Sequence, residues 1–120
     1  MTQKLVPMLN VPDVQAAVDW YVSIGFELQG THSDDGYMSW ASLSFGTTDL
    51  MFNEGGQPSE AHRREVDLYL HVDDLDARWE ALRDRVEVFE PPHDTVYGMR
   101  EFIIRDLNRF WITFGQAMGG

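Results

Sequence analysis

Cysteine is absent from the 120-residue sequence, which excludes disulfides, thiolate metal sites and a cysteine nucleophile. Positive charge is scarce: nine Lys and Arg stand against 20 Asp and Glu, for a formal net charge of −11. Such a charge repels phosphate backbones and anionic membrane surfaces and attracts cations, although it also serves solubility. We therefore expect neither nucleic acid nor a membrane among the partners.

Long hydrophobic runs are also missing. No run approaches the roughly 20 apolar residues of a membrane span, and residues 1–10 lack the apolar core of a signal peptide. A cytoplasmic location is the expectation. Hydrophobic residues still make up 43% of the chain and aromatic residues 12%, which is enough to build one folded domain.

The first half of the chain predicts one strand, one helix and three further strands. Pro12 ends the first strand, Asp13 is placed to cap the helix, and Gly25 stands where a left-handed helix end is expected. The predicted strands cover 4–11, 26–31, 37–45 and 49–53, with turn residues at 33–36 and 46–47.

The second half repeats this order after a polar linker at about 55–64. A helix is predicted from Leu75 to about Asp84, with Asp73 and Asp74 as its caps, and strands cover 66–72, 86–89, 99–105 and 110–114. The segment around Asn10 matches the segment around His71, as expected for a duplicated βαβββ unit.

The prediction is thus an α+β fold, a single domain of two modules at about 1–54 and 65–116. Each module forms a curved mixed four-stranded sheet with its helix on the outer face and its other face lining a ligand trough. Because neither module can bury both its sheet and its helix alone, the two should pair. Pairing within one chain and pairing across a homodimer both stay open.

Several short segments carry a family resemblance. They are Val11-Pro12-Asp13, Trp20-Tyr21, Gly25-Phe26-Glu27 and the stretch from Gly98 to Asp106. In this order, over about residues 4–116, the chain resembles the glyoxalase/bleomycin-resistance/dioxygenase (vicinal oxygen chelate) superfamily, and the Arg-Glu-Phe and Arg-Asp segment is most similar to the bleomycin-resistance branch. The resemblance implies a small, usually dimeric protein whose trough holds either a divalent metal or a bulky ligand.

The metal-binding places of the family, carried over by this resemblance, fall on Val6, Met51, Asp67 and Thr113. Only Asp67 has the chemistry of a hard divalent ligand. His71 and Asp49 lie near these places but do not complete the His and Glu set. We therefore expect no metal and no cofactor, which argues against glyoxalase, extradiol dioxygenase and metal-dependent thiol-transferase activities.

Strand alternation predicts which side chains line the trough. The predicted ligand-binding residues are Met8, Met38, Trp40, Met51, Asp67, Tyr69, His71, Glu101, Ile103, Trp111 and Thr113. Flat aromatic rings beside carboxylates and one histidine suit a planar, cationic or hydrogen-bonding ligand. Asp67 can equally be a solvated edge carboxylate, and the aromatic rings can equally serve dimer packing.

The sequence thus predicts metal-independent binding of a bulky cationic or aromatic compound such as a cationic antibiotic, as in the drug-sequestering proteins that the chain resembles. No catalytic residue is assigned, although His71 and Glu101 could act as base and acid if they met. Two alternatives remain: a metal-dependent enzyme of the glyoxalase or dioxygenase type, and a regulatory module whose pocket is filled by its own side chains.

Overall fold

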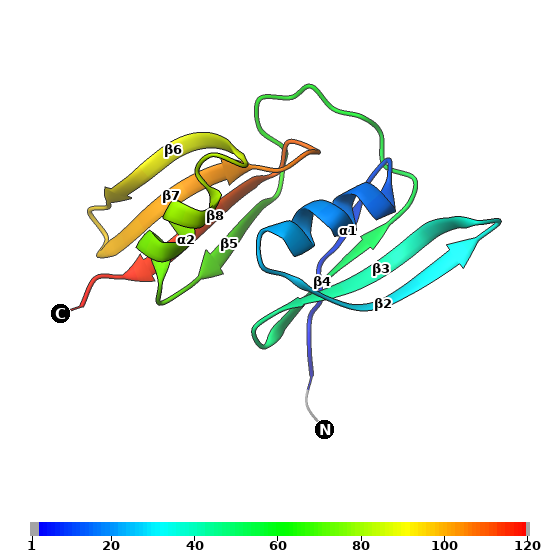
Figure 1. Ribbon diagram of the computed structural model, residues 1–120, viewed down its shortest axis with the longest axis horizontal. Coiled ribbons are helices and arrows are strands. Elements are labelled where there is room, and N and C mark those ends of the chain that lie inside the picture. The colour runs from blue at the N-terminus through cyan, green and yellow to red at the C-terminus, as the bar shows by residue number, and fades with distance from the viewer. Residues whose placement is uncertain (1–2, 120) are drawn as a thin grey trace. The chain divides into compact units, whose positions relative to one another are not determined.

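The computed structural model describes residues 3–119, and packing divides the chain into two compact units, residues 1–59 and 60–120 (Figure 1). Each unit is one βαβββ module. The first contains β1 (Met8–Asn10), α1 (Val14–Ser23), β2 (Glu27–Asp34), β3 (Tyr37–Phe45) and β4 (Thr48–Asn53). The second contains β5 (Asp67–His71), α2 (Leu75–Leu82), β6 (Glu87–Asp94), β7 (Met99–Arg105) and β8 (Trp111–Ala117).

The two sheets have the same topology. Their strand orders are β1-β4-β3-β2 and β5-β8-β7-β6. The first strand of each module pairs in parallel with the last, and the other neighbours are antiparallel. The predicted α+β fold of two repeated units with mixed four-stranded sheets is confirmed.

In the first module the core lies between α1 and one face of its sheet (Figure 1). Tyr21 of α1 is fully buried, and its ring centroid lies 4.9 Å from that of Phe52 in β4. The other buried apolar residues of this module are Leu9, Val11, Val14, Ala17, Val18, Ile24, Phe26, Ala41, Leu43 and Leu50. Aliphatic and aromatic residues of one strand parity therefore meet the apolar stripe of the helix.

The second module packs α2 against β7 and β8 in the same way. The rings of Phe102 and Phe114 stack at 4.7 Å, and Trp79 of α2 meets Phe102 at 5.3 Å. Leu68 and Leu70, which the alternation also assigns to the core face, are only partly buried. In the described residues, no helix is long and apolar enough to cross a membrane.

Helix α1 begins and ends as its sequence predicts. The Asp13 carboxylate accepts a hydrogen bond from the Ala16 amide at 3.0 Å, and this satisfies one of the free N–H groups of the first turn. Gly25 has a φ of 118°, which only glycine adopts without strain, and its amide donates to the Val22 carbonyl.

Helix α2 begins differently, because the predicted side-chain cap is wrong. Asp74 occupies the N-cap position but makes no capping hydrogen bond. Its carboxylate instead pairs with Arg78. The Leu75 amide is satisfied by the side-chain oxygen of Gln116, at 2.9 Å, from the end of β8. The cap is therefore supplied by a residue 41 positions away in the chain.

Several strand boundaries differ from the prediction, including those of β1, β2 and β6. β1 is only three residues long, since Pro7 cannot donate to a ladder. β2 runs on to Asp34, and the reversal is made by Asp35 and Gly36 alone, both at positive φ, as a two-residue hairpin requires. β6 continues through two prolines, which an edge strand tolerates.

Candidate functional site

Each sheet has one face that its own helix does not cover, here called the helix-free face. In the second module three strands contribute to it in register. Asp67, Tyr69 and His71 of β5 lie beside Trp111, Thr113 and Gly115 of β8, which lie beside Arg105, Ile103 and Glu101 of β7. The sequence-predicted residues of this module thus share one face, with Asp67 and Trp111 at one end and His71 and Glu101 at the other.

Glu101 is the centre of a tyrosine–carboxylate cluster on this face, formed by Tyr69, Tyr97 and Glu101. The Tyr69 hydroxyl donates to Oε2 of Glu101 at 2.7 Å, and the Tyr97 hydroxyl donates to Oε1 at 2.8 Å. Glu101 is only 4% exposed. No cationic side chain among residues 3–119 forms an ion pair with Glu101 within 4 Å. Hydrogen bonds from two phenol groups, rather than a cation, therefore stabilise this buried carboxylate.

The two tyrosines respond to this carboxylate. Desolvation, followed by the hydrogen bond to Glu101 and its negative charge, raises the pKa of Tyr69 well above its usual value. The hydrogen bond to Glu101 is the main cause that raises the pKa of Tyr97. Both phenols therefore remain donors at every physiological pH.

Gly115 makes room for this arrangement. A Cβ at this position would lie 2.5 Å from Cζ of Tyr69 and closer still to its hydroxyl oxygen. The Tyr69 ring therefore lies across the backbone of β8 on its way to Glu101. The ring also meets His71, with centroids 4.8 Å apart. Tyr69 remains 41% exposed, so the cluster offers an accessible aromatic ring beside a buried negative charge.

The other end of the same face carries an indole cluster of Trp111, Phe89, His62, Arg63 and Asp67. The Trp111 and Phe89 rings lie 4.1 Å apart, and His62 meets both rings edge-on. The Arg63 guanidinium lies 4.4 Å from the Trp111 ring centroid and is paired with Asp67. Trp111 donates from Nε1 to the His62 carbonyl at 3.1 Å.

The first module presents a more neutral helix-free face. Met8, Met51 and Ser42 lie side by side across β1, β4 and β3, and Asn10, Asn53 and Trp40 form the next row. Asp49 on this face is paired with Lys4. Gly30 of β2 lies opposite Ser42, and a Cβ there would be 3.9 Å from the Trp40 ring. This surface therefore combines thioether, amide and indole groups, and the charge of its Asp49 is neutralised by Lys4.

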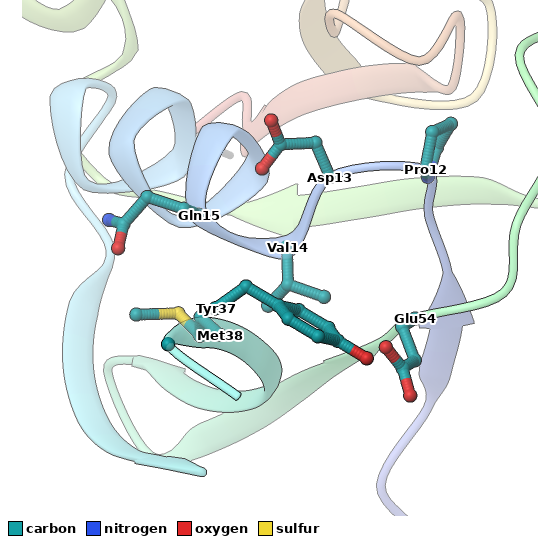
Figure 2. A pocket seen from close by; sticks show the side chains of 8 residues that line it. Pro12, Asp13, Val14, Gln15, Tyr37, Met38 and Glu54 are labelled. Atoms are coloured by element: carbon teal, nitrogen blue, oxygen red, sulfur yellow. The ribbon is translucent and has the colours of Figure 1, made fainter. Parts of the chain in front are cut away.

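A pocket of about 440 Å³ opens in the first module at the start of α1 (Figure 2). It is lined by Pro12, Asp13, Val14, Gln15, Gly36, Tyr37, Met38 and Glu54. The Tyr37 hydroxyl points toward the Glu54 carboxylate, and a hydrogen bond to this group raises the pKa of Tyr37 (Figure 2). Of the predicted ligand-binding residues, Met38 lines this pocket.

The residues present do not fit a divalent metal. Val6 precedes β1, while Met51 and Thr113 offer a thioether and a hydroxyl. The carboxylate of Asp67 is engaged by Arg63. Within residues 3–119, no group of three or more His, Asp or Glu side chains is arranged to hold a metal ion.

The structure brings together some predicted residues and adds others. Tyr69 contacts both Glu101 and His71, whereas Trp111 and Asp67 belong to a separate cluster in which Arg63 contacts both. Thr113 and Ile103 lie between the two clusters in register.

Sequence reasoning missed Tyr97, Gly115, His62, Arg63 and Phe89. Tyr97 sits in the β6–β7 turn, four positions before Glu101, where an aromatic residue beside a glycine was a usable signal. Phe89 could not be assigned by alternation, because the register of β6 shifts between Val88 and Glu90.

The duplicated module, the parallel pairing of first and last strands and the helix-free faces define a class of small α+β proteins built from two βαβββ units. The family model for the Glyoxalase/Bleomycin resistance protein/Dioxygenase superfamily matches residues 5–114. The chain belongs to this superfamily. Comparison with the curated proteins gives no match.

Solved structures agree on the fold. The crystal structure of TioX from Micromonospora sp. ML1 is 24% identical, with a TM-score of 0.80, and the match covers 98% of this chain and all of the other. A superfamily member from Alicyclobacillus acidocaldarius is 13% identical over 98% of this chain and 92% of its own, with a TM-score of 0.78. A superfamily member from Nocardioides is 16% identical, with a TM-score of 0.76, and the match covers 100% of this chain and 87% of the other. Likenesses this remote establish the fold alone.

Proposed function

We propose that this protein binds a bulky cationic or aromatic small molecule without a metal and sequesters it, as bleomycin-resistance members of the superfamily do. The observation that carries the proposal is Glu101, a carboxylate that is 4% exposed and whose side-chain partners within residues 3–119 are two tyrosine hydroxyls. A protonated amine of a guest would supply the missing opposite charge. The exposed ring of Tyr69 would stack on its flat part.

Two further features support a cationic guest. The chain carries a net charge of −11, which raises the local concentration of cations at its surface. The metal-binding places of the family are held by Val6, Met51, Asp67 and Thr113, which do not form a donor set. Shape, stacking and negative charge would then hold the guest, and protein in excess of the guest would leave little of it free.

Calorimetric titration with glycopeptides of the bleomycin type and with basic planar dyes tests the proposal. We expect at least one such compound to bind, and Glu101→Gln to weaken its binding by roughly tenfold or more, since a buried charge pair is worth about 2–5 kcal/mol. Glu80→Gln is the matched control, because it removes the same charge from an exposed position on α2. The proposal would be overturned if no compound of the panel bound, or if Glu101→Gln and the unaltered chain bound with equal affinity.

A second candidate is a regulatory or interaction module whose binding face is filled by its own side chains. It is favoured by Tyr69 lying over Gly115 and by Arg63 lying over Trp111. This candidate predicts that no member of the panel binds and that chelators do not alter the protein. The same titrations therefore separate the two functions.

A further inference from the structure

Arg63 places a planar cation on the aromatic surface of the indole cluster. Its guanidinium carbon lies 4.4 Å from the centroid of the Trp111 ring. Its Nε donates to Oδ1 of Asp67 at 3.3 Å, and its Nη2 donates to Oδ2 of the same carboxylate. Stacking on an indole and two parallel bonds to a carboxylate are two ways in which proteins recognise a guanidinium group.

We propose that Trp111 and Asp67 form a binding site for a planar guanidinium or amidinium group, and that Arg63 occupies this site as an internal competitor. The inference rests on the proposed function, because it assigns the chemical group that this end of the helix-free face takes from a guest. Arg63 then mimics the guest, and a guest enters by replacing it.

The contacts of Arg63 allow such a replacement. Its side chain is 53% exposed and that of Asp67 is 35% exposed, so water screens their pairing. The chain next to Arg63 is held by other groups. Arg64 donates from Nη1 to the Asn108 carbonyl at 2.8 Å, and the side chain of Arg109 donates to the Ala61 carbonyl. The Arg63 side chain can therefore swing away while its backbone keeps its place.

Arg105 and His62 also lie beside aromatic rings of the indole cluster. The Arg105 guanidinium is 6.0 Å from the Phe89 ring and is paired with Glu87 at 3.0 Å, so its charge is balanced. The His62 ring lies edge-on to that of Trp111, with centroids 5.7 Å apart, and so borders the site.

The test uses benzamidine, a flat amidinium compound, titrated at pH 8 into the full-length chain. The readout is the indole N–H resonance of Trp111, assigned by its loss in Trp111→Phe. We expect this resonance to shift, with benzamidine bound about three- to tenfold more tightly by Arg63→Ala than by the unaltered chain, since one exposed ion pair and one cation–π contact no longer compete. Asp67→Asn in the Arg63→Ala background should weaken binding again.

Arg83→Ala is the matched control, because Arg83 also lies over an indole, that of Trp79 at 5.4 Å, and beside the Glu80 carboxylate, but on α2. It should leave benzamidine affinity at Trp111 unchanged. Equal affinities for Arg63→Ala and the unaltered chain, or an unmoved Trp111 resonance in Arg63→Ala, would overturn the inference. A drug panel that fails to bind while the Arg63 effect holds overturns only the proposed sequestering function.

Discussion

Replacing Gly115 with alanine probes the tyrosine–carboxylate cluster most directly. The new Cβ would lie 2.5 Å from Cζ of Tyr69, and ordinary contacts begin near 3.4 Å, so the ring must withdraw by about 1 Å. A hydroxyl that now donates to Glu101 at 2.7 Å would then be out of hydrogen-bonding range. The substitution thus removes one of the two donors that satisfy a buried carboxylate.

The magnitude follows from these contacts. A hydrogen bond to a charged group is worth about 1.5–3 kcal/mol. Since Tyr69 is 41% exposed, water recovers part of this loss, and alanine also stiffens the unfolded chain by about 0.5 kcal/mol. We expect a net loss near 1.5 kcal/mol in the free energy of unfolding, or about 5 °C in melting temperature for a chain of this length.

Urea unfolding followed by circular dichroism measures this change, and Gly30→Ala is its matched control. Gly30 is also a strand glycine on a helix-free face, but a Cβ there meets nothing nearer than 3.9 Å, so its variant should be neutral or slightly more stable. In a Tyr69→Ala background, Gly115→Ala should cost little, because the clashing ring is gone. An equal cost in both backgrounds would refute the reasoning.

Three further outcomes are expected. Because the pKa of Tyr69 is raised in the folded chain, its contribution to stability is complete below about pH 10, where unfolded tyrosine begins to ionise, and is lost as pH rises through the folded value. Tyrosine ionisation, followed by absorbance at 295 nm, should therefore lack the transition at the highest pH in Tyr69→Phe. A transition at the same high pH in this variant would contradict the expectation. Gln116→Ala should lower the free energy of unfolding in urea by about 1 kcal/mol, because it leaves the Leu75 amide without its acceptor. Asp74→Ala should lower it by less than half of that. The reverse order would show that Asp74 caps α2. Gly36→Ala should lose about 1 kcal/mol by the same assay, since φ at this position is 84°, and a neutral result would mean that the β2–β3 turn changes its type.

Local signals in the sequence determined much of the fold. Asp13 caps α1 and Gly25 ends it because both act on amides and carbonyls within four residues. Strand β3 and strand β7 were predicted to the residue, since alternation marks strands with one buried face. The predicted turn at 46–47 appears at Gly46, which has a φ of 60°.

Two contacts that the sequence did not reveal have one common source. Asp74 has the residue type and position of a cap, yet Gln116 reaches Leu75 from β8 and takes that role. The polar segment at about 55–64 has no apolar period that would predict packing, yet His62 and Arg63 contact the Trp111 ring. In both cases the partner is distant in the sequence, so no local pattern could reveal it.

The sequence by itself determined the duplicated βαβββ order and the core face of strands such as β3 and β7, because periodicity is a property of short segments. Only the tertiary structure decided that Glu101 meets two tyrosines, that Gly115 leaves room for one of them, and that Arg63 covers Trp111. Apart from the Tyr97–Glu101 contact, which spans four positions, these contacts join residues 30 to 50 positions apart, where strand register and side-chain rotamers set which groups touch.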